Sequence, residues 1–232
     1  MANKGTVDLL TVGSDRSPLR AREDYVKAIY QIGSGAPVRA AAVARYLAVS
    51  RVAVSKAKRL LEGEGLLEPA RAPSEPLRLS RRGQAMAIAM VRRHRLLETF
   101  LHRSLRVPLE RVHAEAERIE HVISDDVALR IADLLGRPKV DPHGHPIPYE
   151  ASRMPRGPLP TLAGLAAGER ARVVSLDDRD EAGVKALAAA GVLPGASVTV
   201  LAAGTARISV RCGRRTIALR RRHAEMVRIA TT

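Results

Sequence analysis

Hydrophobic positions divide the chain into regions of different periodicity. From Ser17 to about Leu135 the apolar residues recur mainly every three or four positions, which predicts amphipathic helices. From Thr161 to Thr232 they form short, alternating, β-branched runs, which predict strands. The proline-rich segment Lys139–Pro160 predicts a linker rather than a packed element. Met1–Arg16 has no sustained period and predicts a flexible arm.

The helical region begins with a pattern that predicts a helix-turn-helix. Ser17-Pro18 is typical of a helix N-terminus, and the helix it starts ends near Gly33. Two short helices follow, over Val38–Leu47 and over Arg51 to about Glu62, with Ser50 as the N-cap of the second. Two short helices joined by a three- or four-residue turn are the helix-turn-helix layout. The apolar positions of the second of these helices are Val54, Ala57, Leu60 and Leu61.

A wing is predicted directly after the second of these helices. Leu66–Glu68 and Leu77–Leu79 are short apolar runs that predict strands, and a proline-rich tip at 69–76 lies between them. The segment 17–82 is therefore predicted to be a winged helix-turn-helix domain.

Two longer helices are predicted next. Ser80 is the expected N-cap of a helix that runs to about Ser104, and Pro108 begins another that runs to Leu135. Together they predict a helical domain over 83–150, followed by a linker over 151–160.

The tail predicts a small β-barrel over 161–232, so the whole chain is expected to be mainly α with a small β part. One short helix is expected over Ala182–Ala190. The predicted strands are Arg172–Leu176, Ser197–Leu201, Arg207–Arg211, Thr216–Leu219 and Met226–Ile229.

Charge is spread unevenly along the chain. The net charge is +15, and aromatic residues make up only 2%, so the cores must be built from Leu, Val, Ile and Ala. Segment 17–82 has 13 basic and 6 acidic residues, 83–150 has 10 of each, and 151–232 has 14 and 6. A basic helix-turn-helix segment points to a nucleic acid partner, and the alternative is an arginine-rich solvated surface.

The expected compartment is the cytoplasm. The single cysteine, Cys212, excludes an internal disulfide and fits a reducing environment. No apolar run approaches the roughly 20 residues of a membrane span, and the N-terminus lacks a signal-peptide layout.

Histidine and carboxylate residues recur at helical spacing in the neutral helical region. His94 and Glu98 are four residues apart, as are His113 and Glu117, while Glu120 and His121 follow three and four residues after Glu117. These spacings put the side chains on one helix face. Imidazole and carboxylate suit divalent ions such as Mn²⁺ and Fe²⁺. The alternative is an ordinary charged helix face, but two helices in register favour a metal site.

Catalysis has no support in the sequence. A zinc peptidase would need H-E-x-x-H or H-x-x-E-H, and position 117, where the second motif needs histidine, is glutamate. We also find neither a nucleophile elbow nor a Walker loop. The chain is therefore not expected to be an enzyme, and no small-molecule substrate is expected.

Polar and basic side chains on the helix-turn-helix and the wing are the candidate DNA contacts. The N-terminal half of a recognition helix enters the major groove, where such groups meet phosphates and base edges. The alternative is a solvated basic face. The candidates are Arg39, Ser50, Arg51, Ser55, Lys56, Lys58, Arg59, Arg71 and Arg78.

Taken together, these features resemble the diphtheria toxin repressor family of metal-dependent regulators. The resemblance covers about Ser17 to Pro148 well, and the tail more loosely. It implies a winged helix, a helical dimerisation domain with the metal sites, and an SH3-like barrel of the FeoA type. The motifs that carry it are Glu23-Asp24-Tyr25 with Ile29-Tyr30, Arg93-His94-Arg95-Leu96-Leu97-Glu98, Val112-His113, Ile119-Glu120-His121-Val122-Ile123-Ser124-Asp125 and Asp141-Pro142-His143-Gly144-His145-Pro146-Ile147-Pro148.

The resemblance implies two metal sites. One would use Asp24, Glu117, Glu120 and His121. The other would use His94, Glu98 and His113, with a carboxylate lent by the barrel, for which Asp180 or Glu181 are the nearest candidates. The glutamine that iron-type members place a few residues further on is missing near Gly183.

The ligand types bear on which metal binds. Iron-type members have sulfur ligands where this chain has Asp24 and Glu117, whereas the carboxylates match manganese-type members. The cofactor is therefore expected to be Mn²⁺, with Fe²⁺ as the alternative, and other divalent metals can bind in vitro. Lys27 departs from the pattern, because short manganese-type members have glutamate there. A protonated lysine cannot ligate and would repel a nearby cation, which argues against a binuclear site of their kind.

The other histidines and the cysteine are assigned structural places. His143 and His145 are expected to be turn residues rather than ligands, Cys212 to lie in the barrel core or at a strand edge, and His102 and His223 to lie at the surface.

The sequence thus predicts a homodimeric, metal-dependent repressor that binds a palindromic operator and controls metal-uptake genes. Metal would bridge the DNA-binding and dimerisation domains. Two alternatives stay open: a DNA-binding protein whose metal is permanent and structural, and a metal-transport accessory protein. Activation rather than repression also stays open, because the position of the operator is not encoded in the protein.

Overall fold

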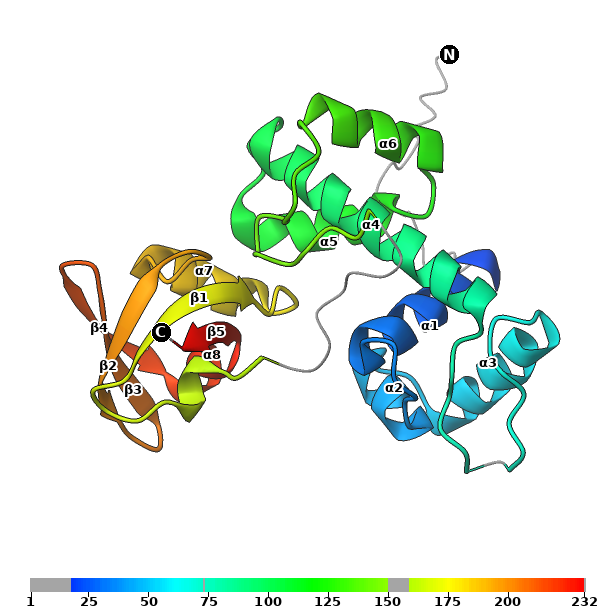
Figure 1. Cartoon of the computed structure of the whole chain (residues 1–232), viewed down its shortest axis with the longest axis horizontal. Coiled ribbons are helices and arrows are strands. Elements are labelled where there is room, and N and C mark those ends of the chain that lie inside the picture. The colour runs from blue at the N-terminus through cyan, green and yellow to red at the C-terminus, as the bar shows by residue number, and fades with distance from the viewer. Residues whose placement is uncertain (1–17, 73, 150–158, 232) are drawn as a thin grey trace, which may run out of the picture.

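Three parts follow one another along the chain (Figure 1). The computed structural model describes residues 18–72, 74–149 and 159–231. Helices α1–α3 lie at one end of the molecule, α4–α6 in the middle, and a small β-rich part at the other end. The predicted arm (1–16), the predicted cap Ser17 and most of the predicted linker (151–160) fall outside the described residues. The predicted fold class, mainly α with a small β part, is confirmed.

The first part is a three-helix unit with a wing. Its helices are α1 (Pro18–Gly33), α2 (Ala40–Tyr46) and α3 (Arg51–Gly63), and the Ser50 side chain caps α3 by accepting from the Ala53 amide at 3.1 Å. The predicted wing strands form only isolated bridges, Leu67 with Leu79 and Val38 with Leu77. Leu60, one of the apolar positions of α3, is 51% exposed. The core of this part includes Val26, Ile29, Val43, Val54 and Leu61.

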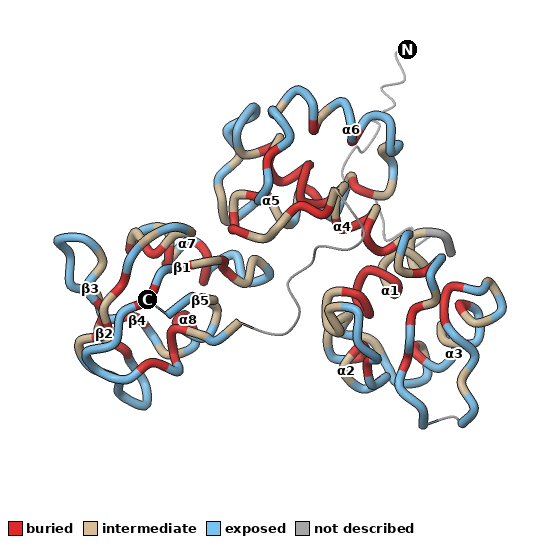
Figure 2. The backbone as a smooth tube through the Cα atoms, in the orientation of Figure 1, coloured by how far each residue is buried: buried red, intermediate tan, exposed pale blue. Residues whose placement is uncertain are grey.

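Helix α4 (Arg81–Arg103) connects the first part to the second, and it has the predicted bounds. Ser80 caps it, accepting from the Gly83 amide at 3.1 Å. A Cβ on Gly83 would lie 2.0 Å from the Leu66 carbonyl oxygen, so glycine lets α4 begin against the wing. Figure 2 shows that α4 is buried along much of its length, whereas the buried stretch of α1 is Val26–Tyr30. Helix α4 is therefore the scaffold on which both parts are built.

The single helix predicted from Pro108 to Leu135 is wrong. The structure has two helices there, α5 (Leu109–Ile119) and α6 (Asp125–Leu134), separated by a turn. The cause is Ser124, whose side chain accepts from the Val127 amide at 3.2 Å and starts a new helix. Glu120 and His121 therefore lie at the C-terminal end of α5 rather than in the middle of a helix.

The segment after α6 is packed, in contrast to the predicted linker over Lys139–Pro160. One oxygen of the buried Asp141 accepts from the amides of His143 (2.8 Å) and His145 (2.9 Å), which closes a tight turn. Gly144 has φ +90°, and a Cβ there would lie 2.1 Å from the Val174 carbonyl oxygen. This turn fits closely against the β-rich part.

The β-rich part is a five-stranded antiparallel sheet of order β4-β3-β2-β1-β5. A 3₁₀ turn, η1 (Leu162–Gly164), precedes it, and its helices are α7 (Glu181–Ala190) and α8 (Arg221–Glu225). Alternate strand residues such as Ile208 and Val210 are fully buried. Cys212 is half-buried against this core, as predicted, whereas His223 is buried, so its predicted surface position is wrong. The strands are β1 (Arg170–Leu176), β2 (Ser197–Ala203), β3 (Arg207–Cys212), β4 (Arg215–Arg220) and β5 (Val227–Thr231), each overlapping its prediction.

Among the described residues, no helix combines the length and apolarity that crossing a membrane requires.

Candidate metal centre and nucleic-acid interface

The histidine and carboxylate side chains gather in two adjoining clusters. We call Asp24, Glu120 and His121 the junction site, because Asp24 lies on α1 and the other two lie at the end of α5. We call His94, Glu98, His113 and Asp178 the core site. In each group one ligand atom per residue lies within 4.8 Å of the others. Residues that recur at helical spacing in the sequence therefore lie close together in the structure.

The junction site is centred on the His121 ring. Its Nε2 lies 3.0 Å from an Asp24 oxygen and 3.4 Å from a Glu120 oxygen. Its Nδ1 lies 2.7 Å from the Glu23 carboxylate, which fixes the ring orientation. The sequence placed Glu23 in a family motif but not among the expected metal-site residues. An Nδ1–H donated to Glu23 leaves the Nε2 lone pair directed at the two ligand carboxylates.

Glu117 does not join Asp24 in this structure. Its side chain is 51% exposed, and one oxygen lies 3.3 Å from the Lys27 ammonium and 3.8 Å from His113 Nε2. It instead belongs to a third group, with His94 and Glu120. Glu120 is thus shared between two groups of potential ligands.

The core site is nearly closed to solvent. His94 Nε2 lies 3.0 Å and His113 Nδ1 3.3 Å from one oxygen of Glu98, whose side chain is fully buried. Asp178 approaches from the loop after β1, with an oxygen 3.6 Å from His113 Nδ1. Helix α7 packs against α5, which holds this loop in place.

Asp178 takes the place that was expected for Asp180 or Glu181. Asp180 is instead the N-cap of α7, accepting from the Gly183 amide at 3.0 Å, and Glu181 is exposed in the first turn of that helix. A carboxylate engaged in capping cannot point away from its own helix into the core site. The β-rich part thus lends a carboxylate, but from two residues earlier in the chain.

His143 also faces the core site, against its expected role as a turn residue alone. It is fully buried, and its Nδ1 lies 3.7 Å from both Glu98 and Asp178. Its Nε2 lies 3.1 Å from the Leu109 carbonyl oxygen, which only an Nε2–H can satisfy. The Nδ1 lone pair then points toward two carboxylates. Glu98, Asp141 and His143 form a further group of potential ligands, and His145 lies 3.5 Å from Asp178.

Orphaned polar atoms test whether these residues fit a cation. Glu98 Oε2, Asp141 Oδ2 and His143 Nδ1 are all buried and have no hydrogen-bond partner among the described residues, although Asp141 Oδ2 lies 3.3 Å from His145 Nδ1. Burying carboxylates and an acceptor nitrogen together is costly unless a cation compensates them. The donors are oxygen and nitrogen with no sulfur, a set suited to Mn²⁺, Fe²⁺ or Zn²⁺. The residues therefore fit a divalent metal.

The ionisation of the ligands is tightly coupled to their neighbours. Burial alone would lower the pKa of each histidine, but hydrogen bonds outweigh it. Asp24 and Glu23 raise the pKa of His121 to about 9, and Asp178 and Glu98 raise that of His113 to about 10. Burial favours neutral Glu120, yet His94 and Lys27 lower its pKa to about 2. Without metal, protons on the histidines balance the carboxylates.

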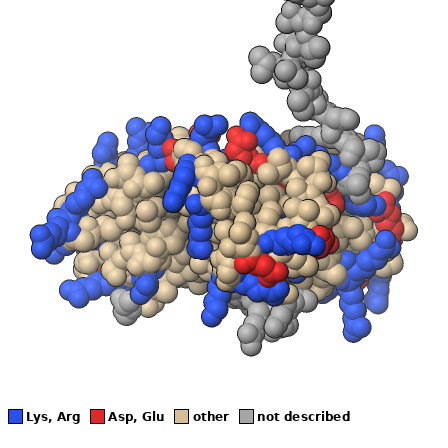
Figure 3. All heavy atoms as spheres, turned by 90° about the horizontal axis from the view of Figure 1, so that it is seen from above, with Lys and Arg blue, Asp and Glu red and all other residues tan. Residues whose placement is uncertain are grey.

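Helix α3 presents a continuous outward stripe. The residues of this stripe recur at spacings of three, one and three and are all exposed. They are Val52, Ser55, Lys56 and Arg59. Val54, on the opposite face of the helix, is buried. Lys and Arg outnumber acidic side chains on the face shown in Figure 3. This stripe presents cationic groups and an apolar side chain of the kind that contact the major groove of DNA.

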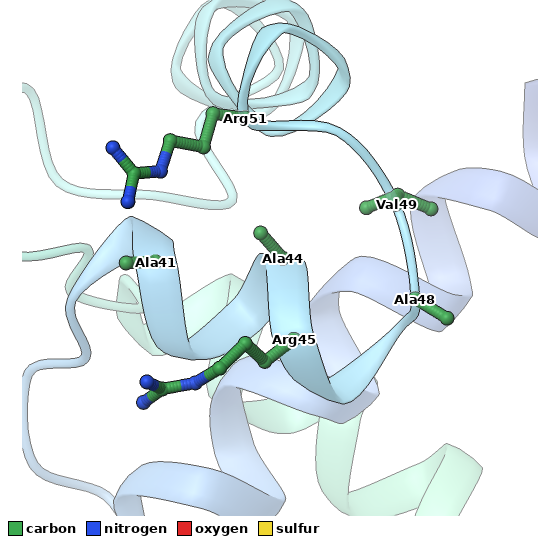
Figure 4. A pocket seen from close by; sticks show the side chains of 6 residues that line it. All are labelled: Ala41, Ala44, Arg45, Ala48, Val49 and Arg51. Carbon is green, nitrogen blue, oxygen red and sulfur yellow. The ribbon is translucent and has the colours of Figure 1, made fainter.

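The turn between α2 and α3 adds further cations. A pocket of about 310 Å³ lies there, with Arg45 and Arg51 on either side of its small residues, as Figure 4 shows. Arg39, directly before α2, and Arg71 on the wing are exposed. Two other candidates are engaged in ion pairs within the protein: Lys58 lies 4.0 Å from Glu62, and Arg78 lies 3.2 Å from Glu68. Lys58 is also only partly exposed, so it is the least available of the predicted contacts.

Comparisons with known proteins agree with this architecture. Residues 80–149 match the family model "Iron dependent repressor, metal binding and dimerisation domain", and residues 161–231 match the FeoA domain. The iron-dependent repressor IdeR of Mycobacterium tuberculosis is 36% identical over 192 residues, covering 77% of this chain and 82% of the relative. The diphtheria toxin repressor of Corynebacterium efficiens is 32% identical with the same coverage.

Solved structures include relatives named for manganese. A manganese-dependent transcriptional repressor in complex with manganese superposes with a TM-score of 0.81 at 32% identity, covering 91% of this chain and 100% of the other. The manganese regulator SloR gives a TM-score of 0.70 at 25% identity, covering 91% of this chain and 98% of the other. The chain belongs to the diphtheria toxin repressor family of metal-dependent transcriptional repressors, which are not enzymes.

Proposed function

We propose that this protein is a manganese-responsive repressor of metal-uptake genes that acts in the cytoplasm as a homodimer on palindromic operator DNA. Residues 17–82 would be the winged helix-turn-helix domain, 83–150 the dimerisation and metal domain, and 161–232 the FeoA-type domain. The observation that carries the proposal is the junction site, where Asp24 from the DNA-binding helices meets Glu120 and His121.

The chain's own residues explain how metal would control DNA binding. A bound divalent ion supplies the positive charge that lets the junction carboxylates stay close together. Asp24, Glu120 and His121 would hold it, fixing α1 against the end of α5 and so fixing the direction in which α3 points. Two copies fixed in this way match two half-sites of a palindrome. A coupling of about 1–3 kcal/mol between metal and DNA is the usual scale for such a link.

Manganese is favoured over iron by the ligand types. Asp24 contributes oxygen to the junction site, and sulfur is absent from both described sites. Oxygen donors favour harder ions such as Mn²⁺. The similarity to a manganese-dependent repressor supports this choice, whereas the relatives named as iron-dependent support Fe²⁺ as the alternative.

A DNA-binding titration tests the proposal. Binding to a palindrome from a metal-uptake promoter is measured in chelator and then with Mn²⁺, anaerobic Fe²⁺ or Zn²⁺, at fixed salt because salt alone shifts such affinities. We expect Mn²⁺ to tighten binding at least tenfold. Equal affinity with and without metal would contradict the proposal. Unfolding in chelator would favour a structural metal, and an absence of specific DNA binding would favour a metal-transport accessory role.

A further inference from the structure

Lys27 occupies an unusual position for a lysine. Lys27 lies on α1 and is only 5% exposed. Its ammonium group points into the metal centre rather than to solvent. The ammonium nitrogen lies 2.8 and 3.0 Å from the two oxygens of Glu120 and 3.3 Å from an oxygen of Glu117. It also lies 3.3 Å from His94 Nδ1. A buried lysine with two carboxylates and an imidazole around it is held as a cation.

The partners of Lys27 are themselves a group of potential metal ligands. His94, Glu117 and Glu120 each offer a ligand atom, and those atoms lie within 4.8 Å of one another. The Lys27 ammonium contacts all three of these residues. The ammonium therefore lies where the three potential metal ligands come together. This group of ligands adjoins the junction site, because Glu120 belongs to both.

The charge balance supports a permanent occupant. Glu120 is 1% exposed, so its carboxylate needs a compensating cation at all times. An ammonium on the chain supplies that charge at any metal concentration.

We propose that Lys27 is a tethered cation that replaces one metal ion in the His94–Glu117–Glu120 cluster. The junction then takes a single exchangeable ion, at Asp24, Glu120 and His121. The inference rests on the proposed metal-binding function and specifies how many ions act at the junction. It also makes Lys27 a positioning residue, because its ion pairs join α1 to the end of α5 without metal.

Variants at position 27 test the count of bound ions. Mn²⁺ per subunit is measured by native mass spectrometry and equilibrium dialysis on the full chain. The Lys27→Glu variant replaces the ammonium with a ligand and is expected to bind one more Mn²⁺ than the wild type. Lys27→Gln is neutral and offers an oxygen, so it is expected to bind the same additional ion. It provides the test of the ion count if Lys27→Glu does not fold. Lys27→Arg keeps the charge and is expected to match the wild type.

Electron paramagnetic resonance locates the extra ion. Two Mn²⁺ ions that share Glu120 are expected to be exchange-coupled, which broadens and weakens the signal of Lys27→Glu relative to the wild type. The inference is overturned if Lys27→Glu and Lys27→Gln bind as many ions as the wild type, or if the extra ion is uncoupled. If the wild type binds no Mn²⁺ at all, the proposed function fails instead.

Discussion

The junction site and the core site use similar ligands but lie in different surroundings. At the junction site the Asp24 side chain is 34% exposed, and the ligands come from two elements, α1 and the end of α5. At the core site the Glu98 side chain is fully buried, and the ligands come from α4, α5 and the loop after β1. If both sites bind a metal ion, as we propose, the two ions would have different roles. An accessible site between two parts can sense, whereas a closed site that joins three segments fastens the fold.

The largest expected effect is that of pH on metal affinity, which should separate the two sites. Metal binds only the neutral imidazole, and the raised histidine pKa values mean that these rings carry protons near pH 7 without metal. The core site must release protons from His94 and His113, whose pKa values are about 9 and 10. The junction site must release one from His121, whose pKa is about 9. Affinity should therefore rise with pH and level off above pH 9 at the junction site and above pH 10 at the core site.

Calorimetric Mn²⁺ titrations between pH 6 and 8, under argon, measure this difference. The affinity of the core site should rise about 100-fold per pH unit and that of the junction site about tenfold, one factor of ten for each proton released. His121→Ala isolates the core site, and His113→Ala isolates the junction site. Equal slopes at the two sites would show that the coupled histidines do not titrate as the contacts imply.

The second effect concerns Glu120, the one residue that serves the junction site and also touches the core site. Its oxygens lie 3.4 Å from His121 Nε2 and 2.5 Å from His94 Nδ1. Replacing it with glutamine removes the negative charge of a junction ligand and leaves a neutral amide in place of the carboxylate beside His94. We expect Glu120→Gln to lose the metal-induced tightening of DNA binding, a change of about 5–150-fold. Fluorescence anisotropy with operator DNA, with and without Mn²⁺, measures it.

A matched control for this variant is Glu115→Gln, on the same helix. Glu115 pairs only with Arg111 and Arg118 among the described residues, at 3.6 and 2.9 Å, and lies outside both sites. It should respond to Mn²⁺ as the wild type does. A Glu120→Gln protein that still tightened tenfold on operator DNA in Mn²⁺ would disprove control through the junction site.

Local patterns predicted the parts of the metal centre that lie within one helix. The four-residue spacing of His94 and Glu98 placed their ligand atoms 3.0 Å apart, and the Ser80 cap gave the start of α4. The same reasoning failed at Ser124, because the apolar period continues across the turn and hides the break. Helical periodicity specifies which residues share a face, but not whether one helix becomes two.

Contacts between distant segments could not be predicted in this way. Asp178 contacts His113 although the two residues are 65 positions apart in the sequence, and no periodic pattern links them. His143 lies in a proline-rich turn, where the local sequence favours a loop and says nothing of the carboxylates that it faces. Lys27 was recognised as a departure from the family pattern, but its place between Glu117 and Glu120 required the fold. Tertiary packing supplies these partners.

The smallest expected effect distinguishes Asp178 from Asp180, two carboxylates separated by one residue. Asp178 faces the core site. Asp178→Asn should therefore weaken Mn²⁺ binding there about 10–100-fold, the usual loss when a group around a metal site is removed. Asp180 caps α7, so Asp180→Asn should change metal affinity little, because asparagine is also a good N-cap. Isothermal titration in the His121→Ala background measures both variants.

Thermal unfolding completes the comparison between these two carboxylates. With Mn²⁺ in excess, the Asp178→Asn protein should lose about 1.4–2.7 kcal/mol of the stabilisation that metal binding gives, because this stabilisation varies with the logarithm of the metal concentration divided by Kd. Asp180→Ala, which removes the cap, should lower stability by about 1 kcal/mol with or without Mn²⁺. If Asp180→Asn weakened Mn²⁺ binding and Asp178→Asn did not, the N-terminus of α7 would lend the carboxylate, as the sequence first suggested. The core site would then be fastened by α7 itself rather than by the loop before it.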